Sequence, residues 1–407
     1  MPKRSTGFSF PADGARLRWQ MPVAVLVGAF LFNLGQGVLR PTLPLYLQRV
    51  FAANYQMVTL IPVVFGAGKW VANLPTGYLL DRIGRKRLMM AGLLLIACMD
   101  LASAVAPLYA LFLGFRAVGG IGWAMFGTVA TTTVVAQPDA RRRGRAVSLL
   151  LMSETLGLLV GSTVGGLLYQ LVGIATPFIF EAACMVLGAV AVAWQTAETA
   201  SGRSAPRPAW SDRRLLRTVL DAPGVLLMSL TAGSLIAIQT GVLVFLYPLY
   251  LAERGHLPPA AVGYFISLTV LGRLLALWLG GSLSDRWGRM AVIIPGLLVY
   301  GALLGSLTLV THPLVLGLWS VLIGAAAGSI ASIPAALVGD QVSPPLHGIA
   351  IGWLRTVTDT GMIVGPLLCG VLADAVDLSA PFLVAAALLT VIAWRWRWQA
   401  IAPSAST

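Results

Sequence analysis

Charged side chains inside long apolar segments are the residues of this sequence best suited to chemistry. Lys69 and Arg273 occupy matching positions 204 residues apart, and Arg40 is a third cation of this kind. Lys69 precedes Asp81 by about three helical turns, or about 18 Å, which reaches the middle of an apolar layer about 30 Å thick. Such cations need a counter-charge or a watery cavity. The candidate cavity residues are Arg40, Lys69, Gln239, Arg273 and Arg355.

Carboxyl groups in the same apolar segments suggest a second kind of chemistry. A carboxyl group whose surroundings change between two states can take up and release a proton. The candidates for proton coupling are Arg116, Glu154, Asp359 and Asp100. Three accounts of the buried charges stay open: proton exchange by the acids, binding of an anionic substrate group by Lys69 and Arg273, and permanent ion pairs that only hold helices together.

The segments that carry these charges are membrane-spanning helices. The sequence is 57% hydrophobic and 11% charged, which a soluble domain of 407 residues would not tolerate on its surface. A membrane-spanning helix needs about 20 apolar residues. Twelve such runs begin near Trp19, Met57, Leu88, Tyr109, Ala146, Pro177, Pro223, Ala260, Met290, Pro313, Gly348 and Ser379. The predicted fold class is therefore an all-α integral membrane protein with 12 transmembrane helices.

An internal repeat divides the chain into two halves. Asp81 and Asp285 lie in similar polar segments 204 residues apart, and the same offset superposes Pro44–Leu47 on Pro248–Leu251 and Gly161 on Gly365. A repeat of this kind predicts two pseudo-symmetric six-helix bundles. The predicted parts are a cytoplasmic tail (1–18), an N-terminal bundle (19–197), a cytoplasmic linker (198–222), a C-terminal bundle (223–400) and a second cytoplasmic tail (401–407).

The polar segment between the second and third apolar runs, Gly-Tyr-Leu-Leu-Asp-Arg-Ile-Gly-Arg-Lys-Arg from residue 77, resembles the signature loop of the major facilitator superfamily. The resemblance implies secondary transport by alternating access. It also implies that Asp81, with Arg82 and Arg85, locks the two halves together on the cytoplasmic face; the other reading is a simple turn. The gating residues so implied are Gly77, Asp81, Arg82, Gly84, Arg85, Gly281, Asp285, Arg286, Gly288 and Arg289.

Two further segments resemble motifs of the same superfamily. Arg116 lies where its members carry an intramembrane arginine linked to proton coupling. A glycine ridge resembles the motif of drug:proton antiporters, although plain helix packing explains small residues equally well. The ridge residues are Gly157, Gly161 and Gly165, repeated as Gly361, Gly365 and Pro366.

The basic residues indicate orientation rather than nucleic-acid binding. Of the 28 Lys and Arg residues, 21 lie in the tails and in alternate loops on one side, whereas the opposite side has only Arg49 and Arg254. By the positive-inside rule, both termini and the signature loops are cytoplasmic. We expect a multi-pass protein of a bacterial inner membrane.

The expected function is proton-coupled export of a small amphipathic or hydrophobic compound. The alternative is an importer or exchanger of an organic anion or metabolite that uses Lys69 and Arg273. Catalytic signatures such as His-Glu-x-x-His and Gly-x-Ser-x-Gly do not occur in the sequence, so we expect no enzyme. We expect no cofactor, metal or nucleic acid. The expected partners are a small-molecule substrate, protons and the lipid bilayer, and the expected state is a monomer.

Overall fold

The computed structural model describes residues 23–135, 140–195, 217, 224–342 and 347–401. The predicted tails and almost all of the linker lie outside the described residues. The helices of the first half are α1 (Val23–Phe51), α2 (Tyr55–Ile83), α3 (Arg85–Ala104), α4 (Tyr109–Val135), α5 (Ala140–Leu171) and α6 (Thr176–Gln195).

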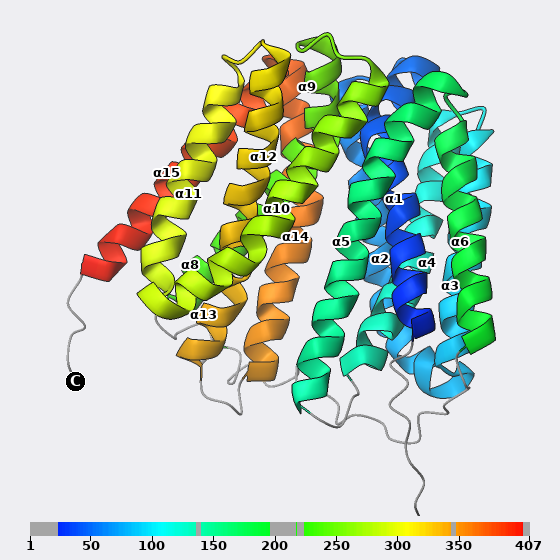
Figure 1. The fold of residues 1–407 in the computed structure, drawn as a ribbon, viewed down its shortest axis with the longest axis horizontal. Helices are drawn as coiled ribbons and strands as arrows, with labels where there is room; N and C mark the ends of the chain where they lie inside the picture. The colour runs from blue at the N-terminus through cyan, green and yellow to red at the C-terminus, as the bar shows by residue number, and fades with distance from the viewer. Residues whose placement is uncertain (1–22, 136–139, 196–216, 218–223, 343–346, 402–407) are drawn as a thin grey trace, which may run out of the picture.

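The second half repeats this series with two interruptions. Its first span consists of α8 (Val225–Ala237), a π-helical segment η1 (Ile238–Leu246) and α9 (Tyr247–Glu253). The remaining helices are α10 (Pro259–Trp287), α11 (Arg289–Leu307), α12 (Pro313–Ile330), α13 (Ile333–Gln341), α14 (His347–Ala375) and α15 (Ala380–Ile401). Helices make up the regular structure of both halves (Figure 1).

Among the described residues, 11 helical runs are long and apolar enough to cross a membrane. The twelfth, α2, has 29 residues and packs against α4 and α14. The fold is therefore the predicted all-α membrane fold with two six-helix bundles.

Helix boundaries and packing keep the register of the repeat. The starts of α2 and α10, of α3 and α11, of α4 and α12, and of α6 and α15 are all 204 residues apart. Gly68 packs against the carbonyl of Ala117, and its counterpart Gly272 packs against the carbonyl of Val321, again at the same offset. The two halves thus pack their helices in the same way.

A glycine makes the sharp turn in each signature loop. Gly84 alone separates α2 from α3 and has φ 90°, and Gly288 alone separates α10 from α11 and has φ 92°. A residue with a side chain rarely adopts such a backbone conformation. The local backbone conformation therefore explains why a glycine occupies this position in each signature loop.

The glycine ridge of α5 lies against the backbone of α1. A Cβ at Gly157, Gly161 or Gly165 would overlap or crowd a carbonyl oxygen of α1, those of Phe30, Leu34 and Val38 respectively. In the second half, a Cβ at Gly361 would overlap the Gly233 carbonyl of α8. These positions let paired helices approach until their backbones touch.

We expect Gly161→Ala to destabilise the N-terminal bundle, because the added methyl group would force α5 away from α1. Overpacking of this kind costs about 1–3 kcal/mol. Gly114 on α4 is the matched control, since a Cβ there meets nothing within 4 Å. Tryptophan fluorescence during heating of detergent-purified protein should show a lower melting temperature for Gly161→Ala alone. Equal melting temperatures for both variants would contradict the close contact.

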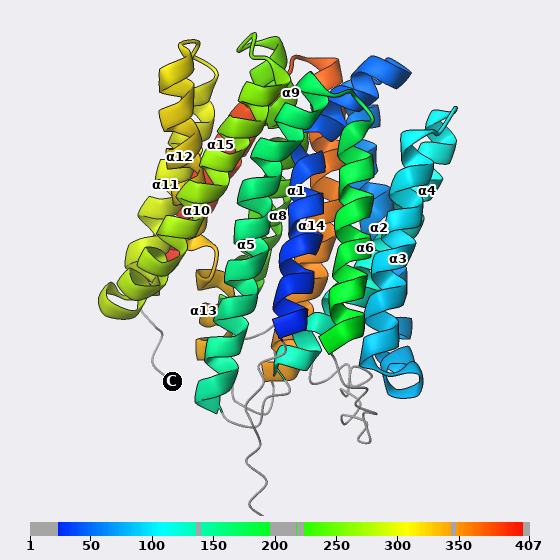
Figure 2. The ribbon, with the colours of Figure 1, turned by 45° about the vertical axis from the view of Figure 1, so that its right-hand side comes forward.

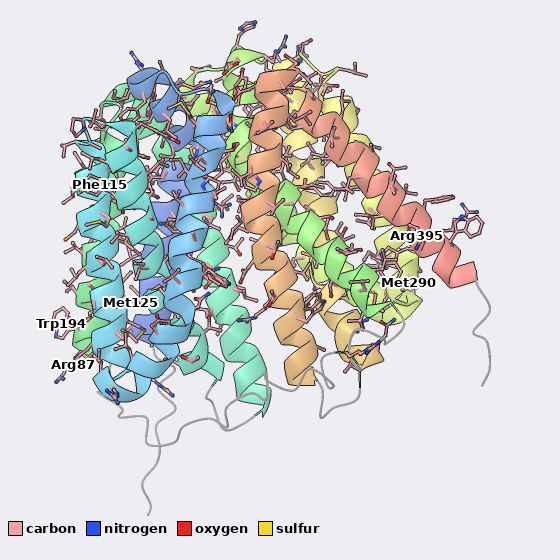
Figure 3. All side chains as sticks on the ribbon, turned by 180° about the vertical axis from the view of Figure 1, so that it is seen from behind. Arg87, Phe115, Met125, Trp194, Met290 and Arg395 are labelled. Carbon is pink, nitrogen blue, oxygen red and sulfur yellow. The ribbon has the colours of Figure 1, made fainter. Side chains whose placement is uncertain are left out.

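The two bundles approach each other more closely at one end than at the other. Helices α5 and α10 converge toward the end where α5 finishes, and they diverge toward the end that holds the signature loops (Figures 1 and 2). We call the first the tight end and the second the signature end. Arg87 and Met290, which lie just after the sharp turns of the two signature loops, are found toward the signature end (Figure 3).

Candidate functional site

A cavity of about 290 Å³ lies between the two bundles. The first bundle contributes α1 and α5, and the second contributes η1, α9, α10 and α12. Its polar lining residues are Asn33, Arg40, Glu154, Thr155, Gln239, Tyr247, Thr269 and Arg273. Most of the other lining side chains are aliphatic, among them Leu158, Leu243 and Val270. The cavity is therefore amphipathic and is shared by both halves.

Two arginines from opposite bundles line this cavity. Arg40 comes from α1 and Arg273 from α10, and the two cations are close enough to interact electrostatically. Within the described part of the chain, neither arginine forms an ion pair, although Glu154 of α5 lines the same cavity. The cavity thus has two cations and one carboxyl group, an arrangement suited to an anionic guest.

The π-helical segment sets the direction of several lining residues. Gln239, Leu243 and Val244 lie in η1, and Tyr247 follows it at the start of α9. Pro248 comes next and has no N–H to donate to the preceding turn, so the change of helical register coincides with it. The Tyr247 hydroxyl lies 2.7 Å from the Ser320 hydroxyl of α12, which fixes the ring at the cavity wall.

Lys69, the repeat counterpart of Arg273, lies outside the lining of this cavity. Its ammonium group sits 4.1 Å from the centre of the Trp123 ring and interacts electrostatically with Asp359 and Arg355 of α14. The residue that corresponds to Trp123 in the second half is Ala327, which lines the cavity. A small side chain therefore leaves room beside Arg273 that a tryptophan fills beside Lys69.

Arg116 and Asp100 meet inside the N-terminal bundle and away from the cavity. Their side chains are buried, and Arg116 Nη1 lies 2.6 Å from Asp100 Oδ1. Of the four candidates for proton coupling, only Glu154 lines the cavity. Asp359 lies at the contact between α2 and α14, near Lys69.

The signature loops lie at the end opposite the tight end. Arg82 and Arg286 are exposed, and Arg289 donates a hydrogen bond of 3.0 Å from Nη1 to Ser284 Oγ. The backbones of Asp81 and Asp285 belong to α2 and α10. The side-chain contacts of these two acids, and the surroundings of Gly77 and Gly281, lie outside what the structure describes.

Hydrogen bonds cross between the bundles at the tight end. The Asp374 carboxylate of α14 accepts backbone N–H bonds from Tyr55, at 2.9 Å, and Gln56, at 2.8 Å, in the first turn of α2. The Glu253 carboxylate of α9 accepts bonds from Gln48 Nε2, at 2.7 Å, and from the Tyr55 hydroxyl, at 2.5 Å. Two acids of the second bundle thus hold the start of α2. We call Glu253 and Asp374 the tight-end latch.

A surface ion pair lies next to the latch, just after the ends of the helices that carry it. Arg254 follows Glu253 and pairs with Asp377, which follows Asp374 by three residues. The backbone N–H of Ser379, 3.0 Å from Asp377 Oδ2, is the main cause that holds the pKa of Asp377 below its usual value. The arginine contributes in the same direction.

We expect Asp377→Asn to lower the stability of the protein slightly, by no more than about 1 kcal/mol, because exposed pairs are weak. A carboxyl group whose folded-state pKa is lowered stabilises the fold above its unfolded pKa and loses that effect as the pH falls through the folded value. The difference in melting temperature should thus be present at pH 7 and shrink below pH 3.8. A difference that grows on acidification would contradict this assignment.

Some lining residues could not be recognised in the sequence beforehand. Asn33, Thr155, Tyr247 and Thr269 are polar residues of kinds that apolar helices often carry, and nothing in their spacing separates them from residues that face lipid. The latch acids occupy helix ends, where acidic residues are common. Their positions at the ends of apolar runs were the available signal.

Together, the fold and the cavity define a class of protein: a membrane transporter in which two helical bundles enclose a shared binding cavity. The chain belongs to the Major Facilitator Superfamily, whose sequence profile matches residues 25–257 and 229–406. It is thus a secondary transporter and a multi-pass membrane protein.

Relatives and solved structures agree with this assignment. The uncharacterized MFS-type transporter YcaD of Salmonella dublin is 28% identical over 299 residues, which are 72% of this chain and 73% of that protein. YcaD of Salmonella typhi is 27% identical over 297 residues, with the same coverage of 72% and 73%. The crystal structure of the nucleoside transporter NupG superposes with a TM-score of 0.78 at 13% identity and covers 94% of this chain and 99% of NupG. A bacterial homolog to the human lysosomal transporter Spinster, in an inward-facing and occupied conformation, gives 0.77 at 15% identity, with coverage of 93% and 96%. These structures share the fold.

Proposed function

We propose that this protein transports a small amphipathic molecule that carries an anionic group. The observation that carries the proposal is the pair Arg40 and Arg273, which line one cavity from opposite bundles. Two cations inside a membrane protein are costly without a counter-charge, and one Glu in the cavity neutralises only one of them. A bound anion would supply the missing charge, and the aliphatic lining would cover an apolar part of the same molecule.

The position of the site favours alternating access. Arg40 belongs to the first bundle and Arg273 to the second. The contacts of a substrate bound to both arginines would therefore change whenever one bundle moves against the other. The latch joins the bundles at the tight end, whereas α5 and α10 diverge toward the signature end. With the signature loops cytoplasmic by the positive-inside rule, this arrangement corresponds to an inward-facing state in a bacterial inner membrane.

Proton-coupled export of an amphipathic or hydrophobic compound is the second candidate. Glu154 favours it, because this acid lines the cavity and forms no ion pair among the described residues. Such a carboxyl group could take up a proton in one state and release it in the other. The two candidates can also combine, with an anion as the substrate and Glu154 as the proton acceptor.

Ligand-induced thermal stabilisation of the purified protein tests the proposal. The probes are benzoate and succinate as anions, tetraphenylphosphonium as a lipophilic cation and uridine as a neutral nucleoside, since one structural neighbour is a nucleoside transporter. We expect an anion to raise the melting temperature in a concentration-dependent manner. Stabilisation by the cation or the nucleoside, with none by either anion, would overturn the proposal.

Proton movement separates the two candidates. Proteoliposomes that contain a pH-sensitive dye report whether a probe drives protons across the membrane. Proton flux that is present in the unmodified protein and lost in Glu154→Gln would support proton coupling. Transport of an anion without proton movement would remove the second candidate and leave the first.

A further inference from the structure

A second polar site lies inside the N-terminal bundle, separate from the cavity. Four helices contribute one side chain each: Gln36 from α1, Asp100 from α3, Arg116 from α4 and Glu181 from α6. Asp100 and Glu181 are 1% and 0% exposed, and Arg116 is 5% exposed. Arg116 Nη1 lies 2.6 Å from Asp100 Oδ1, and Gln36 Nε2 lies 2.6 Å from Glu181 Oε1. One oxygen of each acid therefore has a donor.

The other two oxygens have none. Asp100 Oδ2 and Glu181 Oε2 are buried and receive no hydrogen bond from any described donor. The two carboxyl groups nevertheless interact directly with each other, from helices α3 and α6, which pack together. Two ionised carboxylates repel each other in such a contact, whereas a single proton between them satisfies both oxygens.

The charge balance of the site leads to the same result. Arg116 supplies one positive charge, and its guanidinium is covered by the Phe65 ring of α2 at 5.7 Å. Gln36 is neutral, and the thiol of Cys184, a described neighbour of Glu181 on α6, adds no positive charge. With both acids ionised, the site would have an uncompensated negative charge in the middle of a membrane protein.

We propose that Asp100 and Glu181 form a proton-binding site, in which one proton is shared between Asp100 Oδ2 and Glu181 Oε2. A metal ion fits less well, because the Arg116 guanidinium already lies 2.6 Å from Asp100 Oδ1 and would repel a second cation at this carboxylate. In addition, no group of three or more His, Cys, Asp or Glu side chains that could hold a metal occurs among the described residues.

The fold itself does not require this site. The corresponding positions of the second bundle are Leu304, Ser320 and Ala385, which are all buried. That bundle packs the same helices without any of these charges, so the acids of the first bundle serve something other than helix packing. Gln36 places the site next to the cavity-lining part of α1, because Asn33 and Arg40 lie about one turn away on either side of it and both line the cavity.

Infrared spectroscopy tests the shared proton without any substrate, so the result does not depend on the proposed function. A protonated carboxyl group has a carbonyl stretching band that a carboxylate lacks. We expect this band in the unmodified protein at pH 7 and its loss in both Asp100→Asn and Glu181→Gln, because either variant leaves one carboxylate to balance Arg116. Asp377→Asn, at the surface, is the control and should keep the band. Glu154→Gln is introduced into all of these proteins, so that a protonated Glu154 cannot contribute to the band. A band that then survives in either buried variant would overturn the proposal.

Isotope labelling of the unmodified protein covers the case in which a variant fails to fold. Carbon-13 in the carboxyl groups of either Asp or Glu shifts the band of the labelled group. A shared proton predicts that each label alone changes the band. A band that responds to neither label, or only to one of them, contradicts the shared proton.

Discussion

Replacing Arg273 by Ala is expected to weaken binding of an anionic substrate between about tenfold and about a hundredfold. A hydrogen bond to a charged group contributes about 1.5–3 kcal/mol, and every 1.4 kcal/mol corresponds to about a factor of ten in affinity. Arg273→Lys should recover part of the loss, because it keeps the charge but not the planar fork of donors. The measurement is the dissociation constant of the stabilising anion, from melting temperatures over a range of its concentrations.

Lys69→Ala is the matched comparison for Arg273→Ala. Lys69 is the repeat counterpart of Arg273 but lies over Trp123, outside the cavity lining. We therefore expect the Lys69→Ala protein to bind the anion with nearly unchanged affinity. Arg397→Ala, on the exposed face of α15, controls for the simple loss of a positive charge. An equal loss of affinity in Lys69→Ala and Arg273→Ala would show that the anion bridges two sites. An unchanged affinity in Arg273→Ala would exclude this cavity as the binding site.

The contrast between these two residues illustrates what the sequence could and could not predict. The repeat identified Lys69 and Arg273 as counterparts and placed both near the middle of the membrane. The surroundings of the two cations differ because of one position on a neighbouring helix, which is Trp123 in the first half and Ala327 in the second. Only the packed structure shows that one of these side chains fills the space and the other leaves it open.

The twelve helices and their division into two bundles could be predicted, because each span needs its own run of apolar residues and the register of 204 residues holds along most of the chain. The π-helical segment was not predicted, since Ile238–Leu246 is as apolar as its neighbours and hydropathy does not depend on helical register. Pro248 was the available sign of a disturbed turn.

The pairing of the buried charges could not be predicted from the sequence, for a different reason. Asp100 and Arg116 were considered as separate candidates for proton coupling, yet they face each other across α3 and α4. The helices are apolar almost all round, so periodicity does not show which faces meet. Glu181 therefore could not be matched to Asp100 from spacing alone.

The second large effect is expected at the tight-end latch. Asp374→Ala removes a carboxylate that accepts two backbone N–H groups at the start of α2, where the helix dipole also favours a negative charge. Hydrogen bonds to a charged group contribute about 1.5–3 kcal/mol. We therefore expect the balance between the tight-end-closed state and the opposite state to shift by at least about tenfold. Adding Glu253→Gln should enlarge the shift, because its carboxylate holds Gln48 and Tyr55.

Accessibility of a single cysteine in the cavity measures this shift. Thr269→Cys, in a protein whose native Cys98, Cys184 and Cys369 are replaced by Ser, places a thiol in the cavity lining. In proteoliposomes, a membrane-impermeant maleimide should reach it mainly from the signature end when the latch is intact. With Asp374→Ala, labelling from the tight end should increase about tenfold or more.

Asp377→Ala provides the matched control, because it removes a carboxylate only three residues further along. The described hydrogen-bond and ion-pair partners of Asp377, Arg254 and Ser379, belong to the same bundle. It should leave the side of labelling nearly unchanged. If the Asp374→Ala and Asp377→Ala proteins are labelled to the same extent from the tight end, the contacts of Asp374 do not hold the two bundles together. If Asp374→Ala alone opens the tight end, the latch sets the conformational balance, since a carboxylate on α14 holds a helix of the other bundle.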